Sequence, residues 1–322
     1  MNASTLRKLA TAVVLTAGLT AASGAFAIDD VRIIAPANPG GGWDQTARSM
    51  QEVMQSEGVV KSATVENVPG AGGTIGLAQL ADKENGNPNV LMVNGLVMVG
   101  AILTNQSAVT LEQTTPIARL TGEYEVVVVP ASSDIQTLGQ LIEKLKADTG
   151  AVAWGGGSAG GTDHILAGLI AQAAGADATK INYVPFSGGG EALAAILGGH
   201  VTAGISGLGE WVGQIEAGEL RALAISSPER LEGVDIPTLK EQGVDVDLAN
   251  WRAVVAAPGL DEAQKKELVA AVDAMAKSDG WKKVLADKGW MDLYMSGDAF
   301  AKYLADENAR VGAILKTLGL VS

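Results

Sequence analysis

Short apolar runs alternate with stretches of helical spacing along most of this chain. The apolar runs are strand-like, and several end in a glycine-rich turn that leads into the next helical stretch. This alternation is typical of a mainly parallel sheet covered by helices on both faces, so we expect an α/β fold. The predicted strands are 31–35, 64–67, 90–94, 126–130, 151–154, 181–184, 202–205, 222–225 and 250–256, and the predicted helices include 44–56, 74–81, 163–174 and 191–197.

Two of these strands are predicted to connect two lobes. The β-rich run at 126–130 leads out of the first set of strand–helix units, and the strand at 250–256 leads back to it. The first lobe is then 28–124 with 251–322, and the second lobe is 125–250. Everything after residue 256 is expected to be helical, in helices at 262–277, 281–288 and 298–318. Two crossings form a hinge, so ligand binding should close the cleft.

The N-terminus has the layout of a secretory signal peptide. Arg7 and Lys8 precede an apolar run at 9–19, and small residues follow as far as Ala27. A membrane anchor is the alternative, but the run is shorter than the roughly 20 residues that span a bilayer. We therefore expect cleavage near Ala27, which changes the formal charge from −13 to −15. So acidic a chain argues against nucleic acid or anionic lipid as a partner.

Composition excludes several kinds of chemistry. The chain has no cysteine and two histidines, which are far apart and lack clustered acids. Thiolate catalysis, iron–sulfur clusters and thiolate zinc sites are therefore ruled out, and we expect neither a metal nor a cofactor.

Four glycine clusters lie between a predicted strand and a predicted helix. They occupy residues 39–44, 69–74, 155–163 and 187–191. A helix N-terminus carries unpaired N–H groups and a partial positive charge, and glycine has no Cβ to keep a ligand away from them. Several such termini around one cleft would hold a small anion with few cationic side chains. The sequence therefore indicates a carboxylate-binding protein.

Two enzymatic motifs overlap the third cluster. Gly155, Gly157 and Gly160 match the dinucleotide fingerprint, which also needs an acidic residue at the end of the next strand to bind the ribose. The acid at the right spacing, Asp177, lies in a turn before that strand, so the match fails. Gly156, Ser158 and Gly160 also match the nucleophile elbow of secreted esterases. That fold carries its base histidine late in the chain, and none follows His200. A serine esterase using Ser158 stays as the alternative function.

Several side chains near the clusters allow both a structural and a ligand-binding interpretation. Asp44 and Arg48 are spaced as a surface ion pair, and Asp44 could brace its loop or accept a ligand hydroxyl. Thr162 or Asp163 is expected to cap the following helix. His164 is read as a polar first-turn residue with a possible ligand contact. Arg252 could clamp a carboxylate or form an interlobe salt bridge.

The motifs together resemble the solute receptors of tripartite tricarboxylate transporters. They are PGGGWD at 39–44, ENVPGAGG at 66–73, SAGGTDH at 158–164, VPFSGG at 184–189 and NWR at 250–252, and they span the mature chain. The resemblance implies a two-lobed type II periplasmic-binding-protein fold with a ligand cleft between the lobes. It also implies a monomeric, periplasmic, non-enzymatic receptor that delivers an organic carboxylate to a membrane permease.

The resemblance also implies a ligand and a set of binding residues. A di- or tricarboxylate is expected, with citrate as the first candidate, because the first turn, the segment from Ser206 and the return crossing resemble the citrate-linked branch. The candidate ligand-binding residues are Gly40, Gly41, Gly42, Trp43, Asp44, Gly72, Asn94, Ser158, Gly161, Thr162, Asp163, Ser187, Gly188, Gly189, Ser206 and Arg252.

Overall fold

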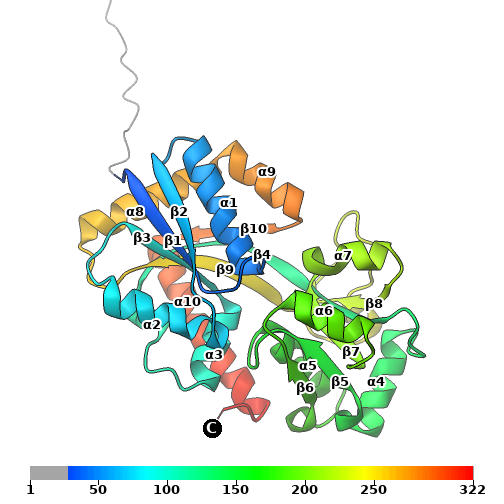
Figure 1. Cartoon of the computed structure of the whole chain (residues 1–322). Coiled ribbons are helices and arrows are strands. Elements are labelled where there is room, and N and C mark those ends of the chain that lie inside the picture. The colour runs from blue at the N-terminus through cyan, green and yellow to red at the C-terminus, as the bar shows by residue number, and fades with distance from the viewer. Residues whose placement is uncertain (1–27, 322) are drawn as a thin grey trace, which may run out of the picture.

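A computed structural model describes residues 28–321, and the predicted signal peptide at 1–27 lies outside the described residues. The chain forms two lobes side by side, with both chain-terminal thirds in one and the middle third in the other (Figure 1). Ten strands form a continuous sheet in the order β2-β1-β3-β9-β4-β7-β5-β6, and β8 and β10 also pair with β4. Over the described range, no helix has the length and apolar character to cross a membrane.

The first lobe has a parallel core of three strands. β1 pairs in parallel with β2 on one side and with β3 on the other, and all six residues of β3 are buried because helices cover both faces. Its elements are β1 (Asp30–Ala35), α1 (Gly42–Ser56), β2 (Ser62–Asn67), α2 (Thr74–Lys83), β3 (Val90–Gly95), α3 (Leu96–Thr104), α8 (Glu262–Lys277), α9 (Asp279–Lys288), β10 (Met291–Ser296) and α10 (Gly297–Thr317).

The second lobe repeats this plan on a smaller scale. β5 pairs in parallel with β6 and β7, and Trp154 and Trp211 are fully buried within the lobe. Its elements are α4 (Leu138–Ala147), β5 (Ala153–Gly156), α5 (Thr162–Ala173), β6 (Asn182–Pro185), α6 (Gly189–Leu197), β7 (Ala203–Gly207), α7 (Leu208–Glu216) and β8 (Leu220–Ile225).

Two antiparallel strands run between the lobes. β4 (Thr115–Pro130) pairs with β9 (Ala249–Ala256) along its first part, from Thr115 to Tyr124. From Glu125 to Pro130 its partners are β7 and β8 of the second lobe. The parallel strands therefore lie at the outer ends of the sheet, and antiparallel pairing joins the two lobes.

One sequence prediction about the C-terminal region was wrong. The region after residue 256 is not entirely helical, because β10 lies between α9 and α10 and pairs antiparallel with β4. Arg119 and Thr121 of β4 also donate side-chain hydrogen bonds to the backbone of β10. The six residues of β10 do alternate, with Met291, Leu293 and Met295 separated by more polar residues, but the run is short and lies between two helical stretches, so it was not recognised as a strand.

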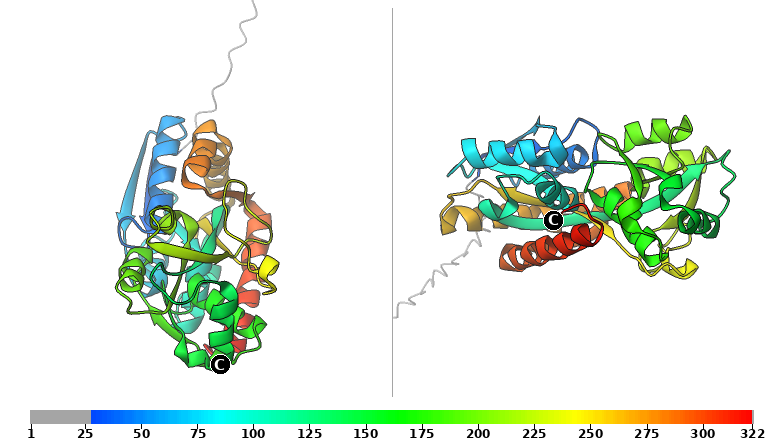
Figure 2. Two further views of the ribbon diagram at one scale, coloured as in Figure 1. Left: turned by 90° about the vertical axis from the view of Figure 1, so that its right-hand side faces the viewer. Right: turned by 90° about the horizontal axis from the view of Figure 1, so that it is seen from below.

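The lobes also touch away from the crossing strands. A Cβ built on Gly100 of α3 would lie 1.9 Å from the carbonyl oxygen of Gly160, which precedes α5. Leu318, just beyond α10, packs with Ala171 and Ala178 of the second lobe and covers Gly168. The C-terminal end of α10 accordingly lies beside the second lobe (Figures 1 and 2).

Candidate functional site

A cavity of about 700 Å³ lies between the two lobes. Its lining comes from the turns that follow the parallel strands, which is where ligands bind in open α/β sheets. The lining residues include Asn38, Gly41, Gly42, Trp43, Gly72, Asn105, Ser158, Asp163, Ser187, Gly188, Gly189, Ser206, Glu210, Asn250 and Arg252.

Four helices that border this cavity begin after a glycine and have no side-chain cap. These are α1, α5, α6 and α7, with N-cap residues Gly41, Gly161, Gly188 and Gly207. By contrast, α4, α8 and α9 are capped by side chains of Thr137, Asp261 and Ser278. The predicted cap at Thr162 or Asp163 was therefore wrong. The uncapped helices keep first-turn N–H groups available to an anion.

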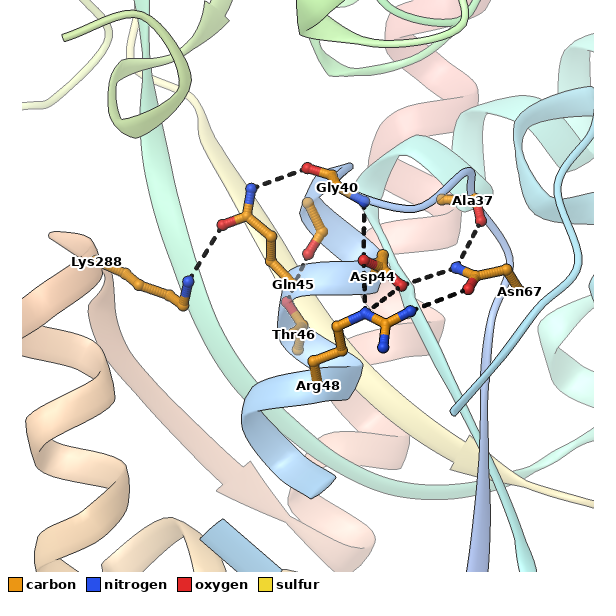
Figure 3. Close-up of polar contacts among 9 residues, drawn as sticks. Ala37, Gly40, Asp44, Gln45, Thr46, Arg48, Asn67 and Lys288 are labelled. Carbon is orange, nitrogen blue, oxygen red and sulfur yellow. Dashed lines mark hydrogen bonds and ion pairs between the residues drawn. The ribbon is translucent and has the colours of Figure 1, made fainter. Parts of the chain in front are cut away.

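Asp44 braces the loop before α1. Its carboxylate accepts the N–H of Gly40 at 2.8 Å and the amide of Asn67 at 2.8 Å, and it pairs with Arg48 at 3.0 Å (Figure 3). Burial works to raise the pKa of Asp44, but these hydrogen bonds together with the Arg48 charge bring that pKa below its usual value. With its oxygens engaged in this network, Asp44 shapes the turn that presents Gly41 and Gly42 to the cavity.

The guanidinium of Arg252 lies against the start of α1. A Cβ on Gly42 would be 2.5 Å from its Nη2, so a larger residue there would have to displace the guanidinium. Nη2 donates to Glu123 on the neighbouring strand, and the two side chains are 3% and 5% exposed. Nη1 is buried without a partner among the described residues. Arg252 thus forms an ion pair and also contributes to the cavity lining, but the pair is not the interlobe salt bridge of the sequence analysis, because Glu123 and Arg252 both belong to the predicted first lobe.

The turn before α5 is held by internal contacts. The N–H of Gly157 donates to Asp163 at 2.5 Å, and the N–H of Gly160 donates to Nδ1 of His164 at 3.1 Å. The imidazole stacks on Tyr183 with ring centroids 4.1 Å apart. Burial lowers the pKa of His164 to about 4, so the ring is neutral near pH 7 and holds the loop.

The turn before α6 is more open. No atom outside its immediate chain neighbours lies within 4 Å of a Cβ built on Gly188, and the N–H of Ser187 donates to Glu191 at 3.1 Å. Gly189 has close neighbours, because a Cβ there would be 1.9 Å from a carboxylate oxygen of Glu210. The α6 terminus therefore faces both the cavity and an acidic side chain from α7.

Four carboxyl groups gather where the crossing strands meet the cavity. Glu123 and Glu125 lie on β4, Asp163 on α5 and Glu210 on α7, and Arg252 is the cation that acts on them. Burial, reinforced by the neighbouring acids, raises the pKa of Glu125 well above its usual value and that of Asp163 to about 7. Across the described residues, no set of three or more such side chains is arranged to hold a metal ion.

Most of the sequence-predicted site residues line the cavity, and five do not. The five outside the lining are Gly40, Asp44, Asn94, Gly161 and Thr162. Thr162 donates to Asn250 at 3.3 Å, and Asn94 is buried on β3, where its amide has no partner within residues 28–321. Glu210 and Asn250 line the cavity but were not predicted, although Asn250 is part of the NWR motif and Glu210 lies in the segment from Ser206. Only their positions in the sequence could have identified them. Glu210 lies in the helix that follows the strand-ending Gly207, and Asn250 precedes Trp251 and Arg252.

Comparison with known proteins agrees with this arrangement. A family described as tripartite tricarboxylate transporter family receptor matches residues 46–320. The protein BugT of Bordetella pertussis is 28% identical over 326 residues, covering 99% of each chain.

Solved structures show the same fold. A Rhodopseudomonas palustris protein solved with adipate has a TM-score of 0.81 at 23% identity, covering 90% of this chain and 97% of its own. MatC from Rhodopseudomonas palustris with bound malate has a TM-score of 0.75 at 22% identity, covering 90% and 100%. With its two-lobed fold, its interlobe cavity and this family match, the chain belongs to the tripartite tricarboxylate transporter receptor family, whose members are periplasmic solute-binding proteins.

Proposed function

We propose that this protein captures an organic di- or tricarboxylate in the interlobe cavity and delivers it to a tripartite transporter permease. The observation that carries the proposal is the convergence of uncapped, glycine-started helices on one cavity that also contains Arg252. Backbone N–H groups and a guanidinium are the donors that bind carboxylates with little side-chain reorganisation. Citrate stays the first candidate ligand, and relatives of the same fold were solved with malate and adipate.

The binding cycle follows from the position of the cavity. Both lobes contribute lining residues, so a ligand that contacts both favours the closed arrangement. We propose that 28–124 with 251–322 move as one body and 125–250 as the other. Support comes from β4, whose partners change from β9 to β7 and β8 between Tyr124 and Glu125. An exported monomer, processed near Ala27, would then present the closed form to the permease.

A serine esterase is the less favoured alternative. Ser158 does line the cavity, but the nearest histidine in sequence, His164, uses Nδ1 to accept the N–H of Gly160 and stacks on Tyr183. His200 lies in an exposed turn after α6. The geometry therefore offers Ser158 a place beside a bound carboxylate and gives it no evident general base.

A thermal-shift panel of organic acids tests the receptor function. A ligand present at 100 times its dissociation constant should stabilise the folded protein by about 2.7 kcal/mol. Isothermal titration calorimetry then gives the affinity of each acid that shifts the melting temperature. The proposal fails if no di- or tricarboxylate shifts the transition. Ester turnover that disappears in Ser158→Ala would instead support the alternative.

A further inference from the structure

The polar lining of the cavity is unevenly divided between acids and bases. Within the described chain, its charged lining residues are Asp163, Glu191 and Glu210, which are acidic, and Arg252, the single cation. Glu191 is turned toward its own loop, where it accepts the N–H of Ser187. A cavity for anions thus carries a carboxylate, Glu210, whose role anion binding alone does not explain.

Glu210 belongs to α7, and its side chain packs against the N-terminal end of α6, where an anion would bind. Its Oε2 is so close to Gly189 that any Cβ there would overlap it, and Ser206 Oγ lies 3.4 Å from the same oxygen. The weak bond from Ser206 is the one hydrogen bond that Glu210 accepts within the described residues. Most of the acceptor capacity of its two oxygens is therefore unused beside the cavity.

Arg252 provides the complementary group. Its Nη1 is buried and has no partner within the described residues, and the guanidinium packs on Gly42 at the start of α1. One side of the cavity is thus lined by a cation whose buried Nη1 lacks a partner within the described residues, and the α6 side offers an unused acceptor. A ligand that satisfies both must carry an acceptor group and a donor group.

We propose that Glu210 determines which carboxylic acids the cleft accepts, by taking a hydrogen bond from a donor on the ligand, such as the hydroxyl of a 2-hydroxy acid. This inference rests on the proposed carboxylate-binding function. An acid of the same skeleton without the hydroxyl leaves a methylene opposite Glu210, so the carboxylate receives no hydrogen bond from it. Without a donor, and with the ligand's negative charge nearby, the desolvated Glu210 carboxylate then takes up a proton from the solvent when such an acid binds.

The surroundings of Glu210 favour this proton uptake. Burial raises its pKa first, Glu123 on β4 raises it further, and Arg252 on β9 and the Ser206 hydroxyl oppose the shift. Asp163 on α5 and Glu125 on β4 are acids of the same cluster, and Glu191 lies on α6. On the α9 side, the backbone of Lys288 packs near Gly209. The acids around the α6 terminus thus outnumber the cations.

Matched ligand pairs test the inference by calorimetry. The pairs are succinate with malate and tricarballylate with citrate, in which the second acid adds only a hydroxyl. Titrations at pH 7.5 in two buffers of different ionisation enthalpy also give the number of protons taken up. The proteins are the wild type, Glu210→Gln, which keeps the shape but removes the charge, and Glu216→Gln, which removes a charge from the exposed end of the same helix.

In the wild type, the hydroxy acid should bind at least about tenfold more tightly than its partner, and the partner should bind with uptake of about one proton. Glu210→Gln should reduce the preference to less than about threefold and abolish the proton uptake, while Glu216→Gln should behave as the wild type. Equal affinities within each pair, or an unchanged preference in Glu210→Gln, would overturn the inference and leave the receptor function standing. If no acid of either pair, and none of the wider panel, binds any of the three proteins, the receptor function itself fails.

Discussion

Arg252 and Glu123 form a buried ion pair across the two strands that join the lobes. Arg252 lies on β9 and Glu123 on β4, and both side chains are at most 5% exposed. Removing one partner of such a pair leaves an uncompensated charge in a low-dielectric environment. Breaking the pair at one partner should therefore destabilise the region that we propose as the hinge.

Replacing Arg252 alone should destabilise the protein more than replacing both partners. Arg252→Met leaves the Glu123 carboxylate buried without its cation, so we expect a loss of about 3 kcal/mol in the free energy of unfolding. The double variant Glu123→Gln with Arg252→Met should recover much of this loss. Urea denaturation of the two variants measures both values. Equal stabilities for the single and double variants would show that the pair does not couple.

The pH dependence of stability should respond to His164. Unfolded histidine takes up a proton near pH 6.5, whereas burial keeps the folded His164 neutral down to about pH 4. Between these values the unfolded state binds more protons, so the contribution of the neutral ring is complete above pH 6.5 and is lost as the pH falls. His164→Gln should therefore gain on the order of 2 kcal/mol at pH 5 relative to pH 7.5, compared with the wild type.

Asp163 should show the opposite trend. Its folded pKa of about 7 exceeds the unfolded value of about 3.8, so the folded state holds the extra proton and stability falls as the pH rises from 4 to 7. Asp163→Asn should remove that fall. Denaturation at pH 5 and pH 7.5 separates the two residues. The assignment fails if both variants change stability in the same direction between these pH values.

The contact between α3 and the turn before α5 should not tolerate a methyl group. A Cβ at Gly100 would lie 1.9 Å from the carbonyl oxygen of Gly160, so Gly100→Ala must push the lobes apart at this point. We expect a loss of about 2 kcal/mol or more, in the range of overpacked cores.

A second helical glycine provides the control. Gly213 lies within α7, with no atom within 4 Å of its added Cβ, so Gly213→Ala should stabilise by about 0.5–1 kcal/mol through helix propensity. Thermal denaturation distinguishes the two signs. A stabilising Gly100→Ala would mean that the lobes are not in contact there.

The free N–H groups at the N-terminus of α6 can be blocked without disturbing the fold. Gly188 has an extended backbone that any residue can adopt, and its added Cβ meets no atom within 4 Å. Gly188→Val should therefore keep its melting temperature but project into the cavity and weaken carboxylate binding at least tenfold, or about 1.4 kcal/mol. Calorimetry checks the affinity, with Gly213→Ala as the matched control. Unchanged affinity would place the ligand elsewhere.

The strand–glycine–helix units could be predicted from the local sequence. The strand β10, which pairs with a distant part of the chain, was not predicted. Short buried strands followed by glycine turns gave β1, β3 and β5 with the helices after them, because each unit carries its own periodicity and turn chemistry. β10 was missed because its pairing with β4 depends on a partner about 170 residues away.

The candidate site shows the same division. The glycine turns that line the cavity carry a local signal, since several glycines between a strand and a helix leave the helix N-terminus open to a ligand. The acid cluster was not predicted, because Glu123, Glu125 and Glu210 become neighbours only when β4 and α7 meet. Asp44 does brace its loop, as the sequence suggested. Its partner Asn67, however, comes from another strand and could not be identified from the sequence.

A crystal structure with the tightest-binding acid of the panel tests the central claim most directly. We expect its carboxylate oxygens within about 2.7–3.2 Å of backbone N–H groups in the first turns of α1 and α6, with Arg252 beside them. A carboxylate held by side chains elsewhere, with those N–H groups facing only water, would contradict the account.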